Sequence, residues 1–427
     1  MRLILFDCDT PMRMNFNPIA LSRPIWELRV GMTSLADKLV AKVAPGDVAC
    51  FVPEYMAESY RTKTDWKVND LSALVGEDLL LADPRLRADG FEPPRTGASQ
   101  VGLDSEGAIL WARITPDDAA KLNAISIEAF LADAAEKLPG AACNLRTWNY
   151  TWDLVLDNPS QITADFAAAG RRGIDGAVEQ PSGVRGSDKD IYVAAGATVH
   201  PMVVLDAENG PIYIDEGAKI HSFTRIEGPC YIGRQSILLG AKCREGMSIG
   251  PVCRVGGEVE ESIIHGHSNK YHDGFLGHAY VGEWVNLGAL TTNSDLKNDY
   301  SNVTIVLDGK SSVNTGSTKV GSLIGDHTKT GIGVLFNTGS YVGAMSMLLG
   351  TGGPLPKFLP SFSWFVEGAV TEGYGKAELY KTARIAMGRR KCAWTAAEEA
   401  MWDAVYDRTA AARDEAVKRG RIQLMKK

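Results

Sequence analysis

Residues 212–238, IYIDEGAKIHSFTRIEGPCYIGRQSIL, decide the fold, because an aliphatic residue recurs in this stretch at every sixth position. A period of six fits neither an α-helix, with 3.6 residues per turn, nor an ordinary strand, with a period of two. It is typical of hexapeptide repeats, in which each six-residue unit forms one side of a triangular prism and three units complete a coil. The aliphatic residues at this spacing are Ile214, Ile220, Ile226, Ile232 and Leu238.

The same spacing continues in both directions along the chain. Glycine often follows the aliphatic residue, as in Ile232-Gly233 and Val342-Gly343, and its missing β-carbon lets the backbone turn the corner of the prism. Residues 189–350 therefore predict a parallel β-helix of about eight or nine coils. The further members of the pattern are Val193, Val199, Leu205, Ile249, Val255, Val281, Leu287, Ile324, Phe336, Val342 and Leu348.

The spacing lapses between Val255 and Val281. We expect residues 259–275 to form a loop or an irregular coil that lifts side chains off the prism face. The segment holds His265, His267 and His272, and a histidine on a solenoid surface is most often a solvated polar residue. No acidic or cysteine partner stands at a suitable spacing from the His-Gly-His motif at 265–267, so a metal site is not favoured.

The composition is that of an ordinary globular protein. The chain has 427 residues and a net charge of −7, which offers no general attraction to nucleic acid or to an anionic membrane. We expect no membrane span, because no window approaches the roughly 20 apolar residues that a bilayer requires. The N-terminus lacks the pattern of a signal peptide. The seven cysteines are scattered without a C-x-x-C pair, which predicts reduced thiols in a cytoplasmic protein.

The N-terminal half alternates strand-like and helical segments, which predicts an α/β domain with a mainly parallel sheet. Besides the first strand, the strand-like segments are 48–53, 79–83 and 109–114, and the helical ones begin near Thr33 and span 127–138 and 160–169. Nucleotide-binding domains usually have a glycine-rich loop after the first strand, whose N–H groups hold phosphates. This chain reads FDCDTPMRM there, without glycine, which argues against a standard nucleotide site.

These patterns divide the chain into four parts. Residues 1–155 form the α/β domain, 156–188 a helix and a linker, 189–365 the β-helix, and 366–427 an amphipathic helical tail. The linker prediction rests on the glycine-rich, charged stretch 170–190, GRRGIDGAVEQPSGVRGSDKD.

The segment 268–300, SNKYHDGFLGHAYVGEWVNLGALTTNSDLKNDY, resembles the acetyltransferase part of the bacterial bifunctional enzymes that make UDP-N-acetylglucosamine. It is most similar to a divergent branch, the alternative UDP-N-acetylglucosamine diphosphorylases and glucosamine-1-phosphate N-acetyltransferases. That branch also shares the phrases GPIYI at 210–214, IGPVCRVGGEV at 249–259 and PSFSW at 360–364. Two positions depart from the family pattern: Phe275 replaces a tyrosine and Gly256 replaces an arginine, which leaves the acceptor sugar open.

The resemblance implies a left-handed β-helix that assembles as a homotrimer. It places His272 at the position of the general base, a role that suits an imidazole at neutral pH. It further implies that backbone N–H groups near Gly288 and Ala289 meet acetyl-CoA and its thioester oxyanion. The implied contacts to the sugar phosphate are Arg254, Lys270 and Lys297, and Asn286 and Asn293 would bind sugar hydroxyls or the base. Those to the phosphates of acetyl-CoA are Arg389, Arg390 and Lys391. The alternative for the tail is a helical cap with a solvated charged face.

The N-terminal stretch 12–31, MRMNFNPIALSRPIWELRVG, also resembles the divergent branch. On this resemblance Arg13, Arg23 and Arg29 contact the nucleotide phosphates, and Asp83 holds Mg²⁺. The alternative is that the arginines make structural ion pairs and that Asp83 only ends a strand.

Together these features predict a cytoplasmic enzyme that acts on sugar phosphates. It would acetylate glucosamine 1-phosphate from acetyl-CoA and couple the product to UTP with Mg²⁺. A second hypothesis keeps only the acetyltransferase, beside a degenerate N-terminal domain. A third is a nucleotidyltransferase for another sugar 1-phosphate, such as a glucose-1-phosphate thymidylyltransferase, with the β-helix as an assembly module. The fourth, a scaffold without enzymatic activity, is disfavoured by His272.

Overall fold

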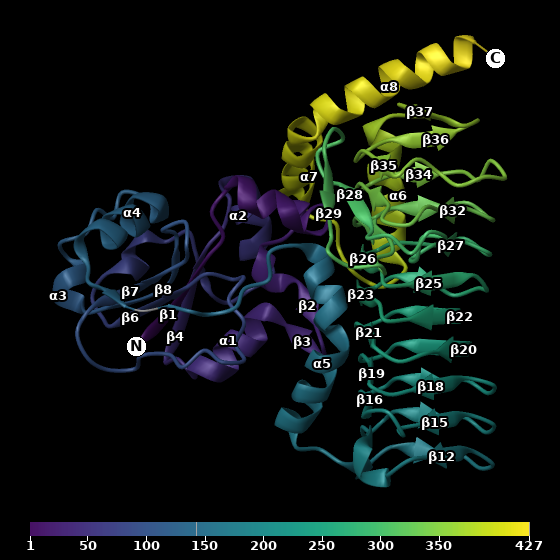
Figure 1. The fold of residues 1–427 in the computed structure, drawn as a ribbon, viewed down its shortest axis with the longest axis horizontal. Coiled ribbons are helices and arrows are strands. Elements are labelled where there is room, and N and C mark those ends of the chain that lie inside the picture. The colour runs from purple at the N-terminus through teal and green to yellow at the C-terminus, as the bar shows by residue number, and fades with distance from the viewer. Residues whose placement is uncertain (142, 427) are drawn as a thin grey trace.

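A computed structural model of the chain describes residues 1–141 and 143–426 (Figure 1). An α/β domain stands beside a tall triangular β-helix, and a helical tail runs along and over the end of the β-helix. The predicted architecture is confirmed in an α/β N-terminal domain, a parallel β-helix and a C-terminal helical tail. None of the described helices combines the length and the apolar character needed to span a bilayer.

The N-terminal domain is built on one seven-stranded sheet. Four neighbouring strands run parallel and β7 pairs in parallel with β9, so the sheet is mainly parallel as predicted, with β8 antiparallel to both of its neighbours. The spatial order is β5 (Lys67–Val68), β4 (Asp47–Phe51), β1 (Arg2–Phe6), β6 (Leu79–Ala82), β8 (Ile109–Ile114), β7 (Gln100–Leu103) and β9 (Gly140–Ala141).

Helices cover both faces of this sheet, because the buried strands are apolar on both sides. Leu39 of α1 (Leu35–Val43) and Met56 of α2 (Glu54–Arg61) pack on one face, and Phe130 of α4 (Ile127–Lys137) packs on the other. A capping box between Ser34 and Asp37 starts α1. The remaining short elements are η1 (Pro11–Phe16), η2 (Ile19–Leu21), η3 (Ile25–Glu27), β2 (Arg29–Val30), β3 (Thr33–Ser34), η4 (Leu71–Leu74) and α3 (Pro116–Ala119).

The connection between the two domains differs from the prediction. Helix α5 (Thr151–Ala169) begins earlier than the predicted 160–169, because Tyr150 and Asp153 form a capping box before it. The stretch predicted as a linker is already part of the β-helix, because β10 (Gly173–Ile174), β11 (Ala177–Val178) and β12 (Gly183–Arg185) pair with strands of the next coil. The glycines and charged residues of this stretch lie at the corners and on the outer faces of the first coil. They do not form a flexible linker.

One face of the β-helix is a sheet of ten parallel strands, one per coil. The aliphatic residues of the hexapeptide pattern fill the prism, and Ile214, Ile220 and Ile226 are fully buried. The strands stack in the order β10, β13 (Ile191–Val193), β16 (Ile212–Ile214), β19 (Cys230–Ile232), β21 (Met247–Ile249), β23 (Ile263–Gly266), β26 (Tyr280–Glu283), β30 (Leu323–Ile324), β33 (Tyr341–Val342) and β35 (Phe358–Leu359).

The other faces are made of shorter and more irregular strands. Two of them, β20 and β22, are long enough to turn a corner, and a register shift marks the turn in their pairing. These faces comprise β14 (Thr198–Val199), β15 (Val204–Asp206), β17 (Lys219–Ile220), β18 (Arg225–Glu227), β20 (Ile237–Cys243), β22 (Arg254–Glu260), β24 (Asn269–Lys270), β25 (Phe275–Gly277), β27 (Thr292–Asn293), β31 (Lys329–Thr330), β32 (Leu335–Phe336), β34 (Met347–Leu348) and β36 (Trp364–Val366), while η5 (Asp188–Asp190) lies before β13.

The predicted break at 259–275 is wrong. The coils continue there in register, with Ile263 stacked on Ser248 and under Tyr280, and Phe275 stacked on Glu258. The spacing lapses because this coil is shorter than the one that stacks Tyr231 on Tyr213, not because the prism opens.

The interruption of the β-helix lies further on, between β27 and β30. There the chain leaves the prism and forms the antiparallel hairpin of β28 (Thr304–Val306) and β29 (Ser312–Asn314). Buried Val303 and Ile305 pack this excursion against the α/β domain. At its base, His278 Nδ1 lies 2.8 Å from Asp295 and Nε2 lies 3.0 Å from Glu261.

The two domains share a largely apolar interface, in which residues 16–30 pack on β23, β26, β30 and β33. Arg23 is the polar centre of this interface: it forms ion pairs with Asp326 and Glu283 and contacts the ring of His265 at 3.0 Å. Because a buried guanidinium needs partners of opposite charge, these contacts fix the orientation of the α/β domain on the β-helix.

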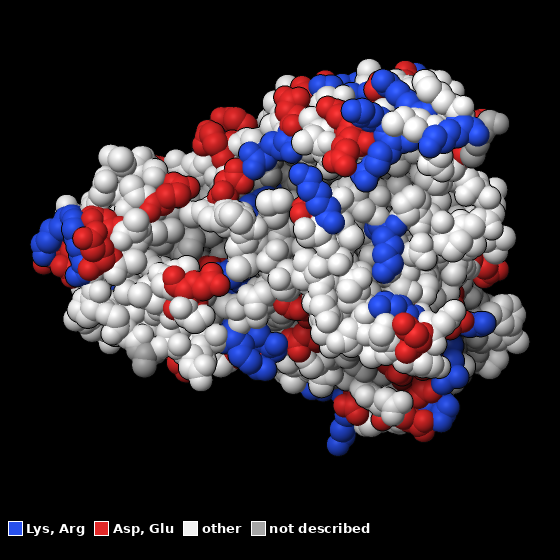
Figure 2. All heavy atoms as spheres, turned by 45° about the horizontal axis from the view of Figure 1, so that its top comes forward, with Lys and Arg blue, Asp and Glu red and all other residues white. Residues whose placement is uncertain are grey.

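The helices of the tail pack at two places in the molecule. Helices α6 (Lys376–Gly388) and α7 (Ala396–Arg408) pack into the core shared with α2, with Tyr380 and Trp402 buried there. Helix α8 (Ala410–Met425) lies on β37 (Ala369–Thr371) and adds Ala416 and Val417 to the core at the end of the prism. Figure 2 shows positive and negative side chains interspersed over the tail, as expected of a solvated charged face.

Candidate active sites

A cavity of about 640 Å³ at one corner of the β-helix brings together most of the residues predicted for acetyl transfer. Its lining comes from β22, from the turn between β24 and β25, from the chain after β26 and from the end of α6. The predicted residues that line it are Arg254, His272, Asn286, Gly288, Ala289, Arg389 and Arg390.

Three guanidinium groups face this cavity without an acidic partner. Arg254, Arg389 and Arg390 make no ion pair with any described residue, and no Asp or Glu lines the cavity. Burial lowers the pKa of Arg254, and the charge of Arg390 lowers it further. Like charges held together without a counter-ion form a ready site for an anion such as a phosphate.

His272 is exposed at this cavity, at the turn after β24. Lys270 fixes the turn from beneath, because its Nζ donates to the carbonyl oxygens of Gly256 at 3.0 Å and His272 at 2.5 Å. Burial lowers the pKa of Lys270 to about 8. Lys270 therefore lies under His272 and orders the backbone there, and it does not line the cavity as a phosphate contact.

The two predicted backbone donors differ. The N–H of Gly288 donates to Thr330 Oγ1 at 2.8 Å, so it is not free for a ligand. The N–H of Ala289 has no acceptor among the described residues, and both residues are partly exposed at the cavity. Of the two, only Ala289 fits the role of an oxyanion donor.

Three other predicted contacts lie away from the cavity. Asn293 is buried, and its amide exchanges hydrogen bonds with the backbone of Gly277 at 2.8 and 2.9 Å. Lys297 lies on the excursion and donates to Ser301 and Asn302. Lys391 is exposed and does not line the cavity.

The sequence reasoning missed Asn269 and Tyr271. Asn269 stacks between Arg254 and Asn286 on successive coils, donates to Asn286 Oδ1 at 3.1 Å and accepts from Arg390 at 3.1 Å. It therefore ties the tail to the wall of the cavity. The signal was present, since Asn269 lies one coil before Asn286 on the same face.

A second cavity, of about 600 Å³, lies in the α/β domain where β1 and β6 end. This is the edge of a parallel sheet at which ligands usually bind. Of the predicted residues, Arg13 and Asp83 line it. The sequence reasoning missed the other charged residues of the lining, which are Asp7, Arg85, Asp104, Glu106 and Glu128.

The cations of this second cavity are all paired. Arg85 donates to both oxygens of Asp83, at 2.8 to 3.2 Å, and Arg13 Nε donates to Asp7 at 3.1 Å. Burial raises the pKa of Asp7, although the Arg13 guanidinium opposes the shift. The lining as a whole is acidic, in contrast to the cavity at His272.

Arg23 and Arg29 do not reach the second cavity. Arg23 belongs to the domain interface, and Arg29 Nη1 donates to the carbonyl oxygen of Met32 at 2.6 Å while its guanidinium lies 5.9 Å from the ring of Tyr231. Their placement supports the alternative in which both arginines are structural.

The donor set of the second cavity does not fit Mg²⁺ as it stands. Both oxygens of Asp83 are engaged by Arg85, and Asp7 Oδ2 accepts from Arg13 and from the N–H of Ile25. Within residues 1–141 and 143–426, no group of three or more His, Cys, Asp and Glu side chains is arranged to hold a metal ion.

Comparison with known proteins finds a family match to the N-terminal domain and relatives with bifunctional names. Residues 3–172 match the model of a family described as sugar nucleotidyl transferase. The chain is 34% identical over 150 residues to the bifunctional sugar-1-phosphate nucleotidylyltransferase/acetyltransferase of Sulfurisphaera tokodaii, covering 33% of this chain and 35% of that protein. It is also 34% identical over 113 residues to the bifunctional protein GlmU of Acidovorax ebreus, covering 26% and 21%.

These matches confirm the resemblance to the bifunctional family that the sequence motifs suggested, and they support the class of transferases. The matched regions span about a third or less of the length of these two relatives. A solved UDP-N-acetylglucosamine acyltransferase of Francisella novicida aligns with 50% of this chain and 74% of its own, at 13% identity and a TM-score of 0.27. The architecture described above rests on the strand pairing itself.

Proposed function

We propose that the chain is a bifunctional enzyme of sugar-nucleotide synthesis, which acetylates glucosamine 1-phosphate with acetyl-CoA and then transfers a uridylyl group from UTP to the product. One observation carries the proposal: an exposed imidazole, His272, and three unpaired guanidinium groups line the same cavity. An amino sugar phosphate and acetyl-CoA bring the complementary groups, namely an amine that must lose a proton and several phosphates.

The acetyl transfer follows from this arrangement. The amine nitrogen attacks the thioester carbon, and the imidazole of His272 takes a proton from that nitrogen. The C–S bond then breaks, the thiolate receives the proton, and the amide and free coenzyme A leave. The N–H of Ala289 is placed to stabilise the oxyanion, Arg254 to bind the sugar phosphate, and Arg389 and Arg390 to meet the phosphates of acetyl-CoA.

A homotrimer would complete this site. The corner of the β-helix that carries His272 also exposes large apolar side chains on neighbouring coils: Phe223 and Ile332 are each 75% exposed. An apolar stripe of this kind marks a protein interface, and a closed three-fold ring would bury the stripe of each copy against the next. The other members of the stripe are Met202, Leu239, Leu290 and Leu349.

We place uridylyl transfer in the cavity at the ends of β1 and β6. The match of residues 3–172 to sugar nucleotidyl transferases supports this placement. When Mg²⁺ is bound with UTP, it would neutralise charge on the phosphates. Asp7 and Asp83 are the nearest candidates to hold it, but both are occupied in this structure, so we derive no step through the metal.

A second candidate function, acetyl transfer alone, is favoured by one observation. In the N-terminal cavity Arg13 and Arg85 are both neutralised by carboxylates, and the glycine-rich loop is missing. A site with no free cation binds a triphosphate poorly.

One assay of the purified chain separates these candidates. Release of free thiol from acetyl-CoA with glucosamine 1-phosphate measures acetyl transfer, and release of pyrophosphate from UTP with N-acetylglucosamine 1-phosphate measures uridylyl transfer. Both products support the bifunctional enzyme, and thiol alone supports the second candidate. Pyrophosphate from dTTP with glucose 1-phosphate, without thiol, would identify a thymidylyltransferase instead, and neither product would contradict both functions.

We assign the enzyme to the cytoplasm, where acetyl-CoA and UTP are available. The free state of the cysteines supports this assignment, because all seven lie outside disulfides.

A further inference from the structure

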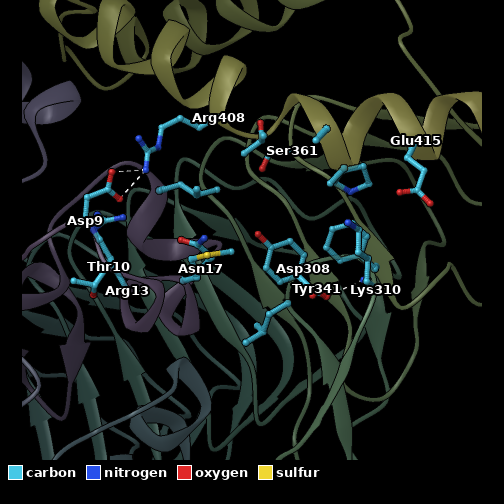
Figure 3. A pocket seen from close by; sticks show the side chains of 18 of the residues that line it. Asp9, Thr10, Arg13, Asn17, Asp308, Lys310, Tyr341, Ser361, Arg408 and Glu415 are labelled. Atoms are coloured by element: carbon cyan, nitrogen blue, oxygen red, sulfur yellow. Dashed lines mark hydrogen bonds and ion pairs between the residues drawn. The ribbon is translucent and has the colours of Figure 1, made fainter. Parts of the chain in front are cut away.

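A third cavity, of about 440 Å³, lies where the three parts of the chain meet (Figure 3). Its walls come from the segment after β1, from the tip of the β28–β29 hairpin, from the β-helix face at β33 and from the junction of α7 and α8. Figure 3 shows Asp9, Thr10 and Arg13 at one side, Lys310 and Glu415 at the other, and Tyr341 between them. Neither proposed reaction, as described above, involves this third cavity.

The middle of the cavity is an aromatic shelf with a free hydroxyl. Tyr341 stacks on Phe358 with ring centroids 5.0 Å apart and planes at 19°. Only 5% of Tyr341 is exposed, yet its hydroxyl makes no hydrogen bond to any described residue. A buried polar group usually has a partner, so this hydroxyl is available to a ligand.

Positive groups stand at the two ends of the shelf. Arg408 pairs with Asp9 through Nη2 alone, at 2.7 Å to both carboxylate oxygens, which leaves the donors on Nη1 and Nε open. Lys310 has no ion-pair partner among the described residues. A ligand that fills the cavity therefore meets a cation at each end, Arg408 beside Asp9 and Lys310 beside Asp308 and Glu415, and an aromatic face between them.

The cavity adjoins the proposed nucleotide site. Thr10 and Arg13 line both cavities, so only the turn between β1 and η1 separates them. A group held at the Arg408 end lies next to this shared wall, whereas a group held at Lys310 lies far from it.

We propose that this junction cavity binds the phosphorylated sugar that accepts the uridylyl group, with the phosphate at Arg408, the ring over Tyr341 and Phe358, and a hydroxyl or acetamido oxygen at Lys310. The inference rests on the proposed uridylyl transfer and deepens it. The excursion of the β-helix and the tail then supply part of the nucleotidyl transfer site, which the α/β domain does not complete alone.

The reaction balances with this placement. A phosphate oxygen of the sugar phosphate forms a bond to the α-phosphorus of UTP in the neighbouring cavity. The bond from that phosphorus to the oxygen bridging to the β-phosphate breaks, and its electron pair leaves with pyrophosphate. The step needs no further reactant.

Two variants test the inference, each with a matched control. In the pyrophosphate assay, Arg408→Ala should raise the KM for N-acetylglucosamine 1-phosphate about tenfold or more, and Tyr341→Phe about threefold. The KM for UTP and the rate of acetyl transfer should stay unchanged in both. Arg384→Ala, an exposed and ion-paired arginine of α6, and Tyr300→Phe, a tyrosine that is 70% exposed, should change none of these values.

A binding measurement keeps the inference testable if the chain releases no pyrophosphate, the result that would contradict the proposed uridylyl transfer. Calorimetric titration with N-acetylglucosamine 1-phosphate is then done in an Arg254→Ala background, where the cavity at His272 no longer holds the phosphate. Binding that is weakened about tenfold by Arg408→Ala supports the junction cavity. Equal binding, or an unchanged KM in an active enzyme, overturns the inference, and equal melting temperatures show that the variants are folded.

Discussion

The cavity at the corner of the β-helix and the cavity of the α/β domain use the same residue type in opposite ways. Arg254 and Arg390 stand without acidic partners, and the charge of Arg390 adds to burial in lowering the pKa of Arg254, whereas Arg13 and Arg85 are each neutralised by a carboxylate. In the first cavity the unpaired cations repel one another and are ready to bind an anion. In the second cavity each cation already has a carboxylate partner. An arginine in a motif therefore identifies a binding site only when some of its donors are left free by acidic side chains and backbone carbonyls.

The strongest test of the comparison removes the imidazole. His272→Ala should lower acetyl transfer by about 10²–10⁴, because the amine loses its proton acceptor. Pyrophosphate release from UTP should be unchanged, since the two cavities share no residue. Thiol and pyrophosphate are measured on the same preparation.

His200→Ala is the matched control, because it removes a half-exposed histidine of another coil. Full acetyl transfer by His272→Ala, or an equal loss in the control, would contradict the role given to His272.

A second test unlinks the two regions. Arg23→Ala should destabilise the protein by about 3–5 kcal/mol, because it leaves Asp326 buried without its cation. The loss should divide one thermal transition into two, with the α/β domain melting first, in differential scanning calorimetry. Arg29→Ala, which removes an arginine of the same interface that forms no ion pair with a described residue, should keep a single transition. A single transition in both variants would show that Arg23 does not fix the domains.

A third test compares a free arginine with a paired one. Arg390→Ala should raise the KM for acetyl-CoA about tenfold or more, through the loss of a charge-assisted contact, and should leave the melting temperature equal or higher. Arg13→Ala should instead lower the melting temperature, because Asp7 is then buried without its partner. Arg384→Ala serves again as the control. A fall in the melting temperature of Arg390→Ala would show that its charge stabilises the fold.

The smallest expected effect concerns pH at the base of the excursion. Burial disfavours the charged form of His278, but the hydrogen bonds that the imidazolium donates to Asp295 and Glu261 outweigh it and raise the pKa to about 9. The raised pKa contributes stability that is complete below the ordinary histidine pKa near 6.5 and is lost as the pH rises through about 9. The pKa values of Glu261 and Asp295 are lowered, so their contribution is present above about 4.5 and is lost in acid.

The melting temperature of the wild type should therefore fall more between pH 6.5 and 9.5 than that of His278→Gln. His221→Gln is the control, since burial lowers the pKa of His221, so this residue does not titrate near pH 9. Equal falls in wild type and His278→Gln would show that the ion pairs do not stabilise the fold.

The β-helix is readable from the sequence because each six-residue unit repeats one local requirement, a buried aliphatic residue such as Ile220 or Ile226. The position of the interruption cannot be read from the sequence, because a shorter coil disturbs the six-residue spacing as much as a loop does, as at Ile263. His272 and Arg254 were identified by their motif, and the short distance along the coils kept them together. The structural role of Arg23 depends on Asp326, which lies 303 positions away in the sequence, and no local pattern predicts such a pair.

Helix α8 has a consequence for the growth of the stack. The last coils of a β-helix offer unpaired backbone groups and an open apolar interior, onto which a further coil of another molecule can add. Val417 and Ala416 close that interior, and Gly420 lets α8 approach so closely that a β-carbon there would lie 2.1 Å from the carbonyl oxygen of Val370. The helix thus covers the end at which a further coil could stack, and Gly420 marks the point at which a single methyl group would push the helix away from it.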